Sequence, residues 1–194
     1  MRKIILASRS KARKKILKDM GIKFQVFESR IKENKNLRKK SCRELVIKNA
    51  LKKARDAASR YKSGVIIAAD TVVLVGKRII GKPKDMKDAF KTLKILSKRP
   101  QRVYTGLAVI DIDKRRTFTA SEKTKVHMRK LTGKDIKNYF RRTSPMDKAG
   151  SFDIQGLGGI FIDRIEGCFY NVVGLPIAKL VKILKKAGIQ GGKI

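Results

Sequence analysis

The chain has no tryptophan, one histidine and two cysteines, so it is poor in aromatic stacking residues and in nitrogen and sulfur metal ligands. Few aromatic residues argue against the stacking platforms on which many proteins bind single-stranded nucleic acid. Cys42 and Cys168 form neither a metal-binding spacing nor a disulfide framework, which predicts a reducing, cytoplasmic setting. His127 has no other ligand type near it in the sequence, so we assign it no role.

Long apolar runs are also missing. No stretch approaches the roughly 18 consecutive apolar residues of a membrane-spanning helix, and the apolar start is too short for a secretory signal. We find no internal repeat, low-complexity tract or linker. With 194 residues, 42% of them hydrophobic, the sequence predicts a single domain over residues 1–194 with a substantial core.

Acidic residues are scarce: sixteen Asp and Glu stand against fifty Lys and Arg, a net charge of +34. Such an excess suggests a nucleic acid or another polyanion as partner. The basic residues are spread along the whole chain, however, which equally suits a lysine-rich solvated surface. A basic nucleic-acid-associated protein without catalysis is therefore the alternative class.

The stretch 64–83 organises the chain. Two short apolar runs, 65–69 and 71–75, predict strands buried on both faces, with Asp70 between them. A charge among core strands is costly unless it has a partner. Asp70 either ends one strand and caps the next turn, or lies at a strand end where open α/β sheets carry their chemistry.

The N-terminal segment predicts a strand over 3–7 followed by a helix over 11–20. Ser10 suits the N-cap position, and Arg13 lies in the first turn. Free backbone N–H groups and the helix dipole favour a phosphate at such a helix start. An ordinary capped helix with a surface arginine fits this segment equally well.

The rest of the chain contains both strand and helix patterns. Predicted strands cover 23–29, 102–113, 116–128, 161–165 and 170–173, and predicted helices cover 41–61, 85–97, 132–141 and 177–187. Asn49, Lys52 and Lys53 share one side of the helix that begins with the Ser41–Glu44 capping box. Lys52 could reach a phosphate or simply be solvated. Glu33, in the polar loop 30–40, could be a ligand or a solvated loop residue.

Six motifs in a fixed order carry a family resemblance: LASRSKAR at the start, AADTVV at 68–73, GKP at 81–83, VYTG at 103–106, DKAGSFDIQG at 147–156 and NVVGLP at 171–176. Together they resemble the Maf family of nucleoside triphosphate pyrophosphatases, over nearly the whole chain. The DKAG…IQG form is similar to the branch that acts on dTTP and UTP.

The resemblance implies an α/β fold: an elongated mixed β-sheet flanked by helices, with two lobes around a central cleft, often in a homodimer. It implies hydrolysis between the α- and β-phosphates, which yields a nucleoside monophosphate and pyrophosphate. The family's role is regarded as housecleaning of unwanted nucleotides, linked to arrest of cell division.

The resemblance also implies site residues. The catalytic aspartate matches Asp70, and the acidic residue that would share a Mg²⁺ or Mn²⁺ ion with it matches Glu33. The phosphate-site residues match Ser8, Arg13, Lys52 and Lys82, and the specificity positions match Ala12, Thr71 and Gln155. Because a triphosphate carries several negative charges, positioning and charge neutralisation dominate such catalysis.

Three positions depart from the family pattern. Lys11 stands where the family usually has proline, Ala12 where it has the first of two arginines, and Ser144 where it often has glutamate. Alanine offers no hydrogen-bond donor at a position where arginine offers five. The change at position 12 therefore bears on substrate choice more than on catalysis.

Overall fold

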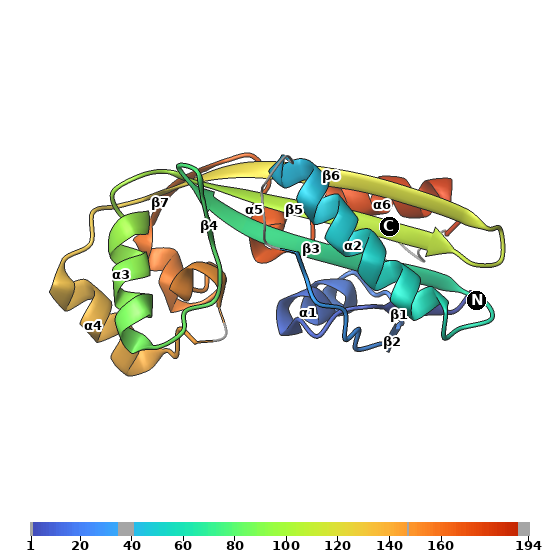
Figure 1. Ribbon diagram of the computed structural model, residues 1–194, viewed down its shortest axis with the longest axis horizontal. Helices are drawn as coiled ribbons and strands as arrows, with labels where there is room; N and C mark the ends of the chain where they lie inside the picture. Colours follow the sequence, from blue (N-terminus) through green and yellow to red (C-terminus); the bar gives the residue numbers. More distant parts are fainter. Residues whose placement is uncertain (1, 35–40, 147, 190–194) are drawn as a thin grey trace. The chain divides into compact units, whose positions relative to one another are not determined.

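The computed structural model describes residues 2–34, 41–146 and 148–189 (Figure 1). Residues 35–40 of the predicted loop and Asp147 of the DKAG motif lie outside the described part. The chain divides into two compact units. The first comprises 1–71, 105–122 and 173–194, and the second comprises 72–104 and 123–172.

Within the described residues, one mixed sheet of seven strands runs in the order β2-β1-β3-β5-β6-β7, with β4 paired to β3. The strands are β1 (Ile4–Leu6), β2 (Gln25–Val26), β3 (Val65–Val75), β4 (Arg78–Ile80), β5 (Gln101–Asp111), β6 (Arg116–Met128) and β7 (Ile162–Glu166). β1 is parallel to both β2 and β3, whereas β4 and β7 pair antiparallel with their neighbours. This is the α/β class with a mixed sheet that the sequence predicts.

The first unit is a three-layer arrangement. Helix α2 (Cys42–Ala58) lies on one face of the sheet, and helices α1 (Lys11–Asp19) and α6 (Ile177–Lys186) lie on the other (Figure 1). Along β3, Val65 and Ile67 pack towards α1 and α6, while Ile66 and Ala68 pack towards α2. Strand alternation therefore divides consecutive β3 residues between two cores.

The second unit has its own core. Helices α3 (Met86–Leu96) and α4 (Gly133–Arg142) pack together, and α3 also contacts the 3-10 turn η1 (Ala149–Ser151). A second 3-10 turn, η2 (Leu157–Phe161), precedes β7, and helix α5 (Phe169–Val173) follows it. Tyr139 and Phe161 meet edge to face in this core, with ring centroids 4.9 Å apart.

Local sequence signals explain where the helices begin. Ser10 caps α1 by accepting a hydrogen bond from the Arg13 backbone N–H, and Ser41 and Glu44 form the predicted capping box of α2. Each cap satisfies backbone donors that have no partner inside the helix, which stabilises it by about 1 kcal/mol.

The predicted and observed elements differ over 65–75 and 170–173, and the strand predicted over 23–29 is reduced to β2. The runs 65–69 and 71–75 form one continuous strand, so Asp70 lies within a strand rather than at its end. The strand continues because side chains of α2 satisfy the carboxylate. The apolar run predicted as a strand over 170–173 is the helix α5 instead, because its buried Asn171 side chain donates to the Val103 carbonyl and the Thr124 hydroxyl. Short apolar runs do not by themselves distinguish helix from strand.

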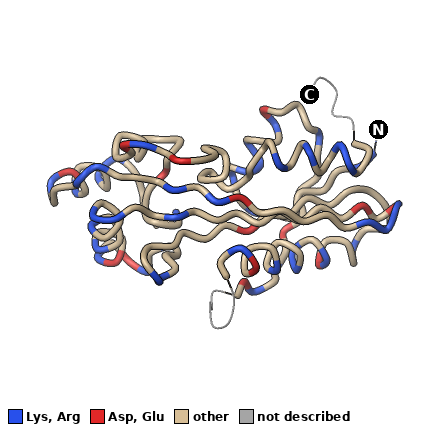
Figure 2. Tube along the Cα trace, turned by 90° about the horizontal axis from the view of Figure 1, so that it is seen from above, with Lys and Arg blue, Asp and Glu red and all other residues tan. Residues whose placement is uncertain are grey.

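Basic residues occur throughout the trace rather than in one segment (Figure 2). No helix in the described ranges is long and apolar enough to cross a membrane.

Candidate active site

The site lies where β1 ends beside β3. The last backbone bond of this pair runs from the Ala7 N–H to the Ile67 carbonyl, at 2.8 Å. Further along β3, two side chains reach the Ala69 carbonyl instead: the Arg13 Nη1 donates at 2.9 Å and the Lys53 Nζ at 3.4 Å. Chemistry in α/β sheets commonly gathers at such carboxyl ends of parallel strands.

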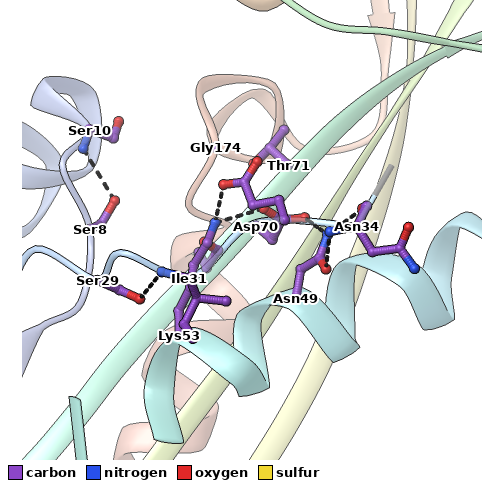
Figure 3. Close-up of polar contacts among 12 residues, drawn as sticks. Ser8, Ser10, Ser29, Ile31, Asn34, Asn49, Lys53, Asp70, Thr71 and Gly174 are labelled. Atoms are coloured by element: carbon purple, nitrogen blue, oxygen red, sulfur yellow. Dashed lines mark hydrogen bonds and ion pairs between the residues drawn. The ribbon is translucent and has the colours of Figure 1, made fainter. Parts of the chain in front are cut away.

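Asp70 points towards α2 and is almost completely buried. Its Oδ1 accepts a hydrogen bond from the Lys53 Nζ at 2.7 Å, and its Oδ2 accepts one from the Asn49 Nδ2 at 2.9 Å (Figure 3). Asn49 and Lys53 are four residues apart on α2, so they lie one turn apart on the same face. Two donors from one rigid helix thus fix the orientation of the carboxylate.

Glu33 joins this cluster through Lys53. The Lys53 Nζ lies 2.6 Å from the Glu33 Oε1, so one ammonium bridges two carboxylates. The neighbouring Asn34 exchanges two hydrogen bonds with Asn49, which ties the loop to α2. Partial burial would raise the pKa of Glu33, but the charge of Lys53 and its hydrogen bond together lower this pKa below its ordinary value.

Arg13 occupies the opposite face of β3 and is buried. In the described part of the chain its guanidinium donates only to neutral oxygens: the carbonyls of Gly174 (2.8 Å) and Ala69 (2.9 Å) and the hydroxyls of Ser8 (3.2 Å) and Thr71 (2.9 Å). Burial lowers the pKa of Arg13, and the more distant charges of Asp70 and Glu33 oppose that effect. Its positive charge is held in place without a directly bonded carboxylate.

The start of α1 continues this face. Ser8 is buried, and its hydroxyl accepts hydrogen bonds from the Ser10 N–H and from Arg13, both at 3.2 Å. Ser10 in turn caps the helix. A buried guanidinium, a hydroxyl and the N-terminus of a nine-residue helix therefore meet at the end of β1, which is a combination suited to an anion.

The structure brings together five of the residues singled out from the sequence: Ser8, Arg13, Glu33, Asp70 and Thr71. Ala12 is half-buried on α1, next to Arg13. Lys82 and Gln155 belong to the second unit, and both are exposed. There, the Gly81 carbonyl accepts a bond from the Gly150 N–H at 3.2 Å, which joins the GKP motif to the DKAG motif.

The structure distinguishes two neighbouring lysines of α2. Lys52 is exposed on α2, whereas its neighbour Lys53 is buried and contacts both carboxylates. Successive helix residues point about 100° apart, so only one of the two can face the sheet. The spacing of four from Asn49 to Lys53 was the available signal. Asn49 and Thr105, a buried neighbour of Thr71, were also missed.

Taken together, fold and site define an α/β protein with a carboxylate–ammonium cluster on one face of a strand and a buried arginine on the other. The family model of Maf-like protein matches residues 3–187. The chain is similar over nearly its full length to relatives named dTTP/UTP pyrophosphatase, among them those of three organisms. That of Methanosarcina barkeri is 44% identical over 98% of this chain and 96% of its own length. Those of Dictyoglomus turgidum and Carboxydothermus hydrogenoformans are 42% and 41% identical, over 97% and 96% of this chain and 98% and 99% of their own lengths. The chain belongs to the Maf family.

Proposed function

We propose that this protein is a nucleoside triphosphate pyrophosphatase that hydrolyses dTTP and UTP to the monophosphate and pyrophosphate. The observation that carries the proposal is the buried Asp70, which two side chains of α2 orient beside a second carboxylate, Glu33. The names of the full-length relatives support the reaction and the pyrimidine substrates.

Asp70 acts as the general base in this proposal. Lys53 and Asn49 hold its two oxygens, so the carboxylate is already oriented to accept a proton from the attacking water. Lys53 joins the proposal as the residue that orients Asp70, because it contacts both carboxylates. Its ammonium also keeps Glu33 close to Asp70. The phosphate contact expected of Lys52 stays a prediction.

Arg13 and Ser8 provide the phosphate contacts. Since neutral acceptors surround the Arg13 guanidinium, its charge remains available to a polyanion, and burial strengthens the attraction. Thr71, whose hydroxyl accepts a hydrogen bond from Arg13, is the proposed specificity residue on this face. The resemblance further implies a phosphate contact for Lys82 and a specificity role for Gln155, whose amide can both donate to and accept from a base edge.

A divalent cation, Mg²⁺ or Mn²⁺, fits the donor set. No group of three or more His, Cys, Asp or Glu among the described residues could hold a metal ion by itself. Two carboxylates completed by substrate phosphates and water are a usual Mg²⁺ environment. Glu33 and Asp70 would hold the ion, which when bound neutralises phosphate charge.

Pyrophosphate release from a panel of nucleotides in the presence of Mg²⁺ tests this function. The panel should contain dTTP, UTP, CTP, the purine triphosphates and 7-methyl-GTP. We expect dTTP and UTP to have the highest kcat/KM. Absence of pyrophosphate release from every nucleotide would contradict the proposal, and a preference for 7-methyl-GTP would contradict the assigned branch.

Partners other than the nucleotide are part of the same proposal. We expect a homodimer, to be checked by sedimentation equilibrium. We also expect the net charge of +34 to give non-specific retention on nucleic acid that falls steeply with salt. Tight, salt-resistant binding to one defined RNA or DNA, without nucleotide hydrolysis, would favour the alternative of a non-catalytic nucleic-acid-associated protein. A cytoplasmic location stays a prediction from the cysteine content.

A further inference from the structure

Two consecutive residues of β5, Thr105 and Gly106, lie beside the two halves of the site. We call these the Arg13 half and the Asp70 half, after the residue at the centre of each. Both belong to the VYTG motif at 103–106, to which no role has been given so far. Strand alternation sends them to opposite faces. On β5, Leu107 packs with α1 and α6 while Ala108 packs with α2, so Thr105 shares the Arg13 face and Gly106 the Asp70 face.

Thr105 supports the Arg13 half. It is completely buried, and its hydroxyl oxygen lies 2.9 Å from the Thr71 hydroxyl oxygen. The Thr71 oxygen also accepts a hydrogen bond from the Arg13 Nη2, at 2.9 Å. A hydroxyl has one proton and two acceptor sites. With both neighbours bonded, Thr71 is held in one rotamer and the guanidinium is held with it.

Gly106 supports the Asp70 half. A Cβ atom at this residue would lie 2.4 Å from the backbone carbon and oxygen of Val46 and 2.6 Å from the nitrogen of Ile47. The backbone of α2 therefore rests directly on β5 at this point. Val46, Asn49 and Lys53 follow the spacing i, i+3 and i+7, so the residue at the contact lies on the same helix face as the two donors to Asp70.

We propose that Thr105 and Gly106 are positioning residues of the pyrophosphatase site: Thr105 fixes Arg13 through Thr71, and Gly106 fixes the approach of Asn49 and Lys53 to Asp70. The proposal rests on the proposed function. Neither residue contacts the substrate. The Thr105 hydroxyl acts on the Arg13 half of the site without touching the nucleotide.

The test compares Thr105→Val, which removes the hydroxyl, with Thr105→Ser, which keeps it. We expect Thr105→Val to raise KM for dTTP and UTP about tenfold to a hundredfold, since a chain of hydrogen bonds to a charged group is lost. We expect kcat to change less, and Thr105→Ser to restore most of the wild-type KM. Thr124→Val is the matched control, because Thr124 is an equally buried threonine that bonds to Cys168 in the second unit.

A second readout does not depend on turnover. The NMR signals of the Arg13 Nη2 protons, which face the Thr71 hydroxyl, should be protected from exchange in wild type and Thr105→Ser, and exchange faster in Thr105→Val. If wild type releases pyrophosphate while Thr105→Val matches it in KM and in Nη2 proton protection, the positioning role is wrong. An equal rise in KM in Thr124→Val would also overturn it, as the effect would then be general destabilisation. If wild type releases no pyrophosphate, the proposed function fails, and the exchange measurement still decides whether Thr105 holds Arg13.

Discussion

Asp70 and Thr71 are adjacent in the sequence, yet they belong to two chemically different surroundings on opposite faces of β3. The Asp70 face holds two carboxylates and one ammonium, joined by short ion pairs. The Thr71 face holds one guanidinium among neutral hydroxyls and carbonyls. Negative charge is thus left over on one face and positive charge on the other.

This difference suits the groups that the proposed reaction brings together. The uncompensated arginine matches phosphate oxygens, whereas the excess carboxylate matches a divalent cation and a water that must lose a proton. On both faces, protein oxygens accept the hydrogen bonds of the charged donors. The two faces can be altered separately, which leads to five predictions.

The largest effect is expected from Asp70→Asn on the carboxylate face. This substitution keeps the shape of the side chain and removes the base, so kcat should fall by about 10²–10⁴-fold. Pyrophosphate release from dTTP measures it, with a melting curve to show that the variant is folded. Asp19→Asn, an exposed acid on α1 paired with Lys15, is the control. A folded Asp70→Asn variant with wild-type kcat would remove Asp70 from the mechanism.

Lys53→Gln should have the next largest effect. It leaves two carboxylates close together without the cation between them, so we expect about a hundredfold lower kcat/KM and a loss of up to about 3 kcal/mol in unfolding free energy. Parallel kinetics on Lys52→Gln decide between the two lysines. A larger loss at position 52 would show that the exposed lysine matters more than the one that orients Asp70, and would contradict the role of Lys53.

Gly106→Ala should disturb the carboxylate face while leaving the Arg13 face intact. The added methyl group would overlap the backbone of α2, which we expect to cost about 1–3 kcal/mol in unfolding free energy. Movement of Lys53 and Asn49 away from Asp70 should lower kcat with little change in KM. Gly133→Ala is the matched control, because a Cβ there meets only ordinary contact, 3.7 Å from Phe90. Equal kcat in both variants would show that the α2 contact does not position the base.

Ala12→Arg tests the Arg13 face, and here the expected gain is in selectivity. A new guanidinium in the first turn of α1 could regain one charged hydrogen bond to base or ribose, worth about 1–3 kcal/mol. The ratio of kcat/KM for dTTP and UTP to that for CTP should rise accordingly. Unchanged ratios across the nucleotide panel would show that position 12 does not contact the discriminating part of the substrate.

The smallest effect concerns Glu33 and pH. The pKa of Glu33 is lowered from an ordinary value of 4.5, so its ion pair with Lys53 stabilises the folded state above that value. This contribution is lost as the pH falls through the lower, folded-state pKa. Because 43% of the Glu33 side chain is exposed, we expect only about 0.5 kcal/mol. Urea unfolding of wild type and Glu33→Gln from about pH 3 to pH 7 measures it. A difference independent of pH would contradict the ion-pair contribution.

Much of the fold could be predicted from sequence, because its signals are local. Ser10 and the Ser41–Glu44 capping box marked helix starts, and apolar runs marked the long strands. The residues Ser8, Arg13, Glu33 and Asp70 were also singled out from sequence, through the family resemblance. The helix α5 was missed, because a short apolar run does not distinguish helix from strand and the bonds of Asn171 join distant segments.

By itself, the sequence determined the caps, the strand and helix periodicity, the charge and the family, since each depends on residue identity and spacing along the chain. Only the tertiary structure decided which of Lys52 and Lys53 faces Asp70, because this depends on how α2 packs on the sheet through Ala50, Ala54 and Ala57. It also decided that β3 runs through Asp70. A buried carboxylate is stable within a strand only when another element supplies its partners. Here the partners are side chains of α2, and their contact with β3 exists only in the folded protein.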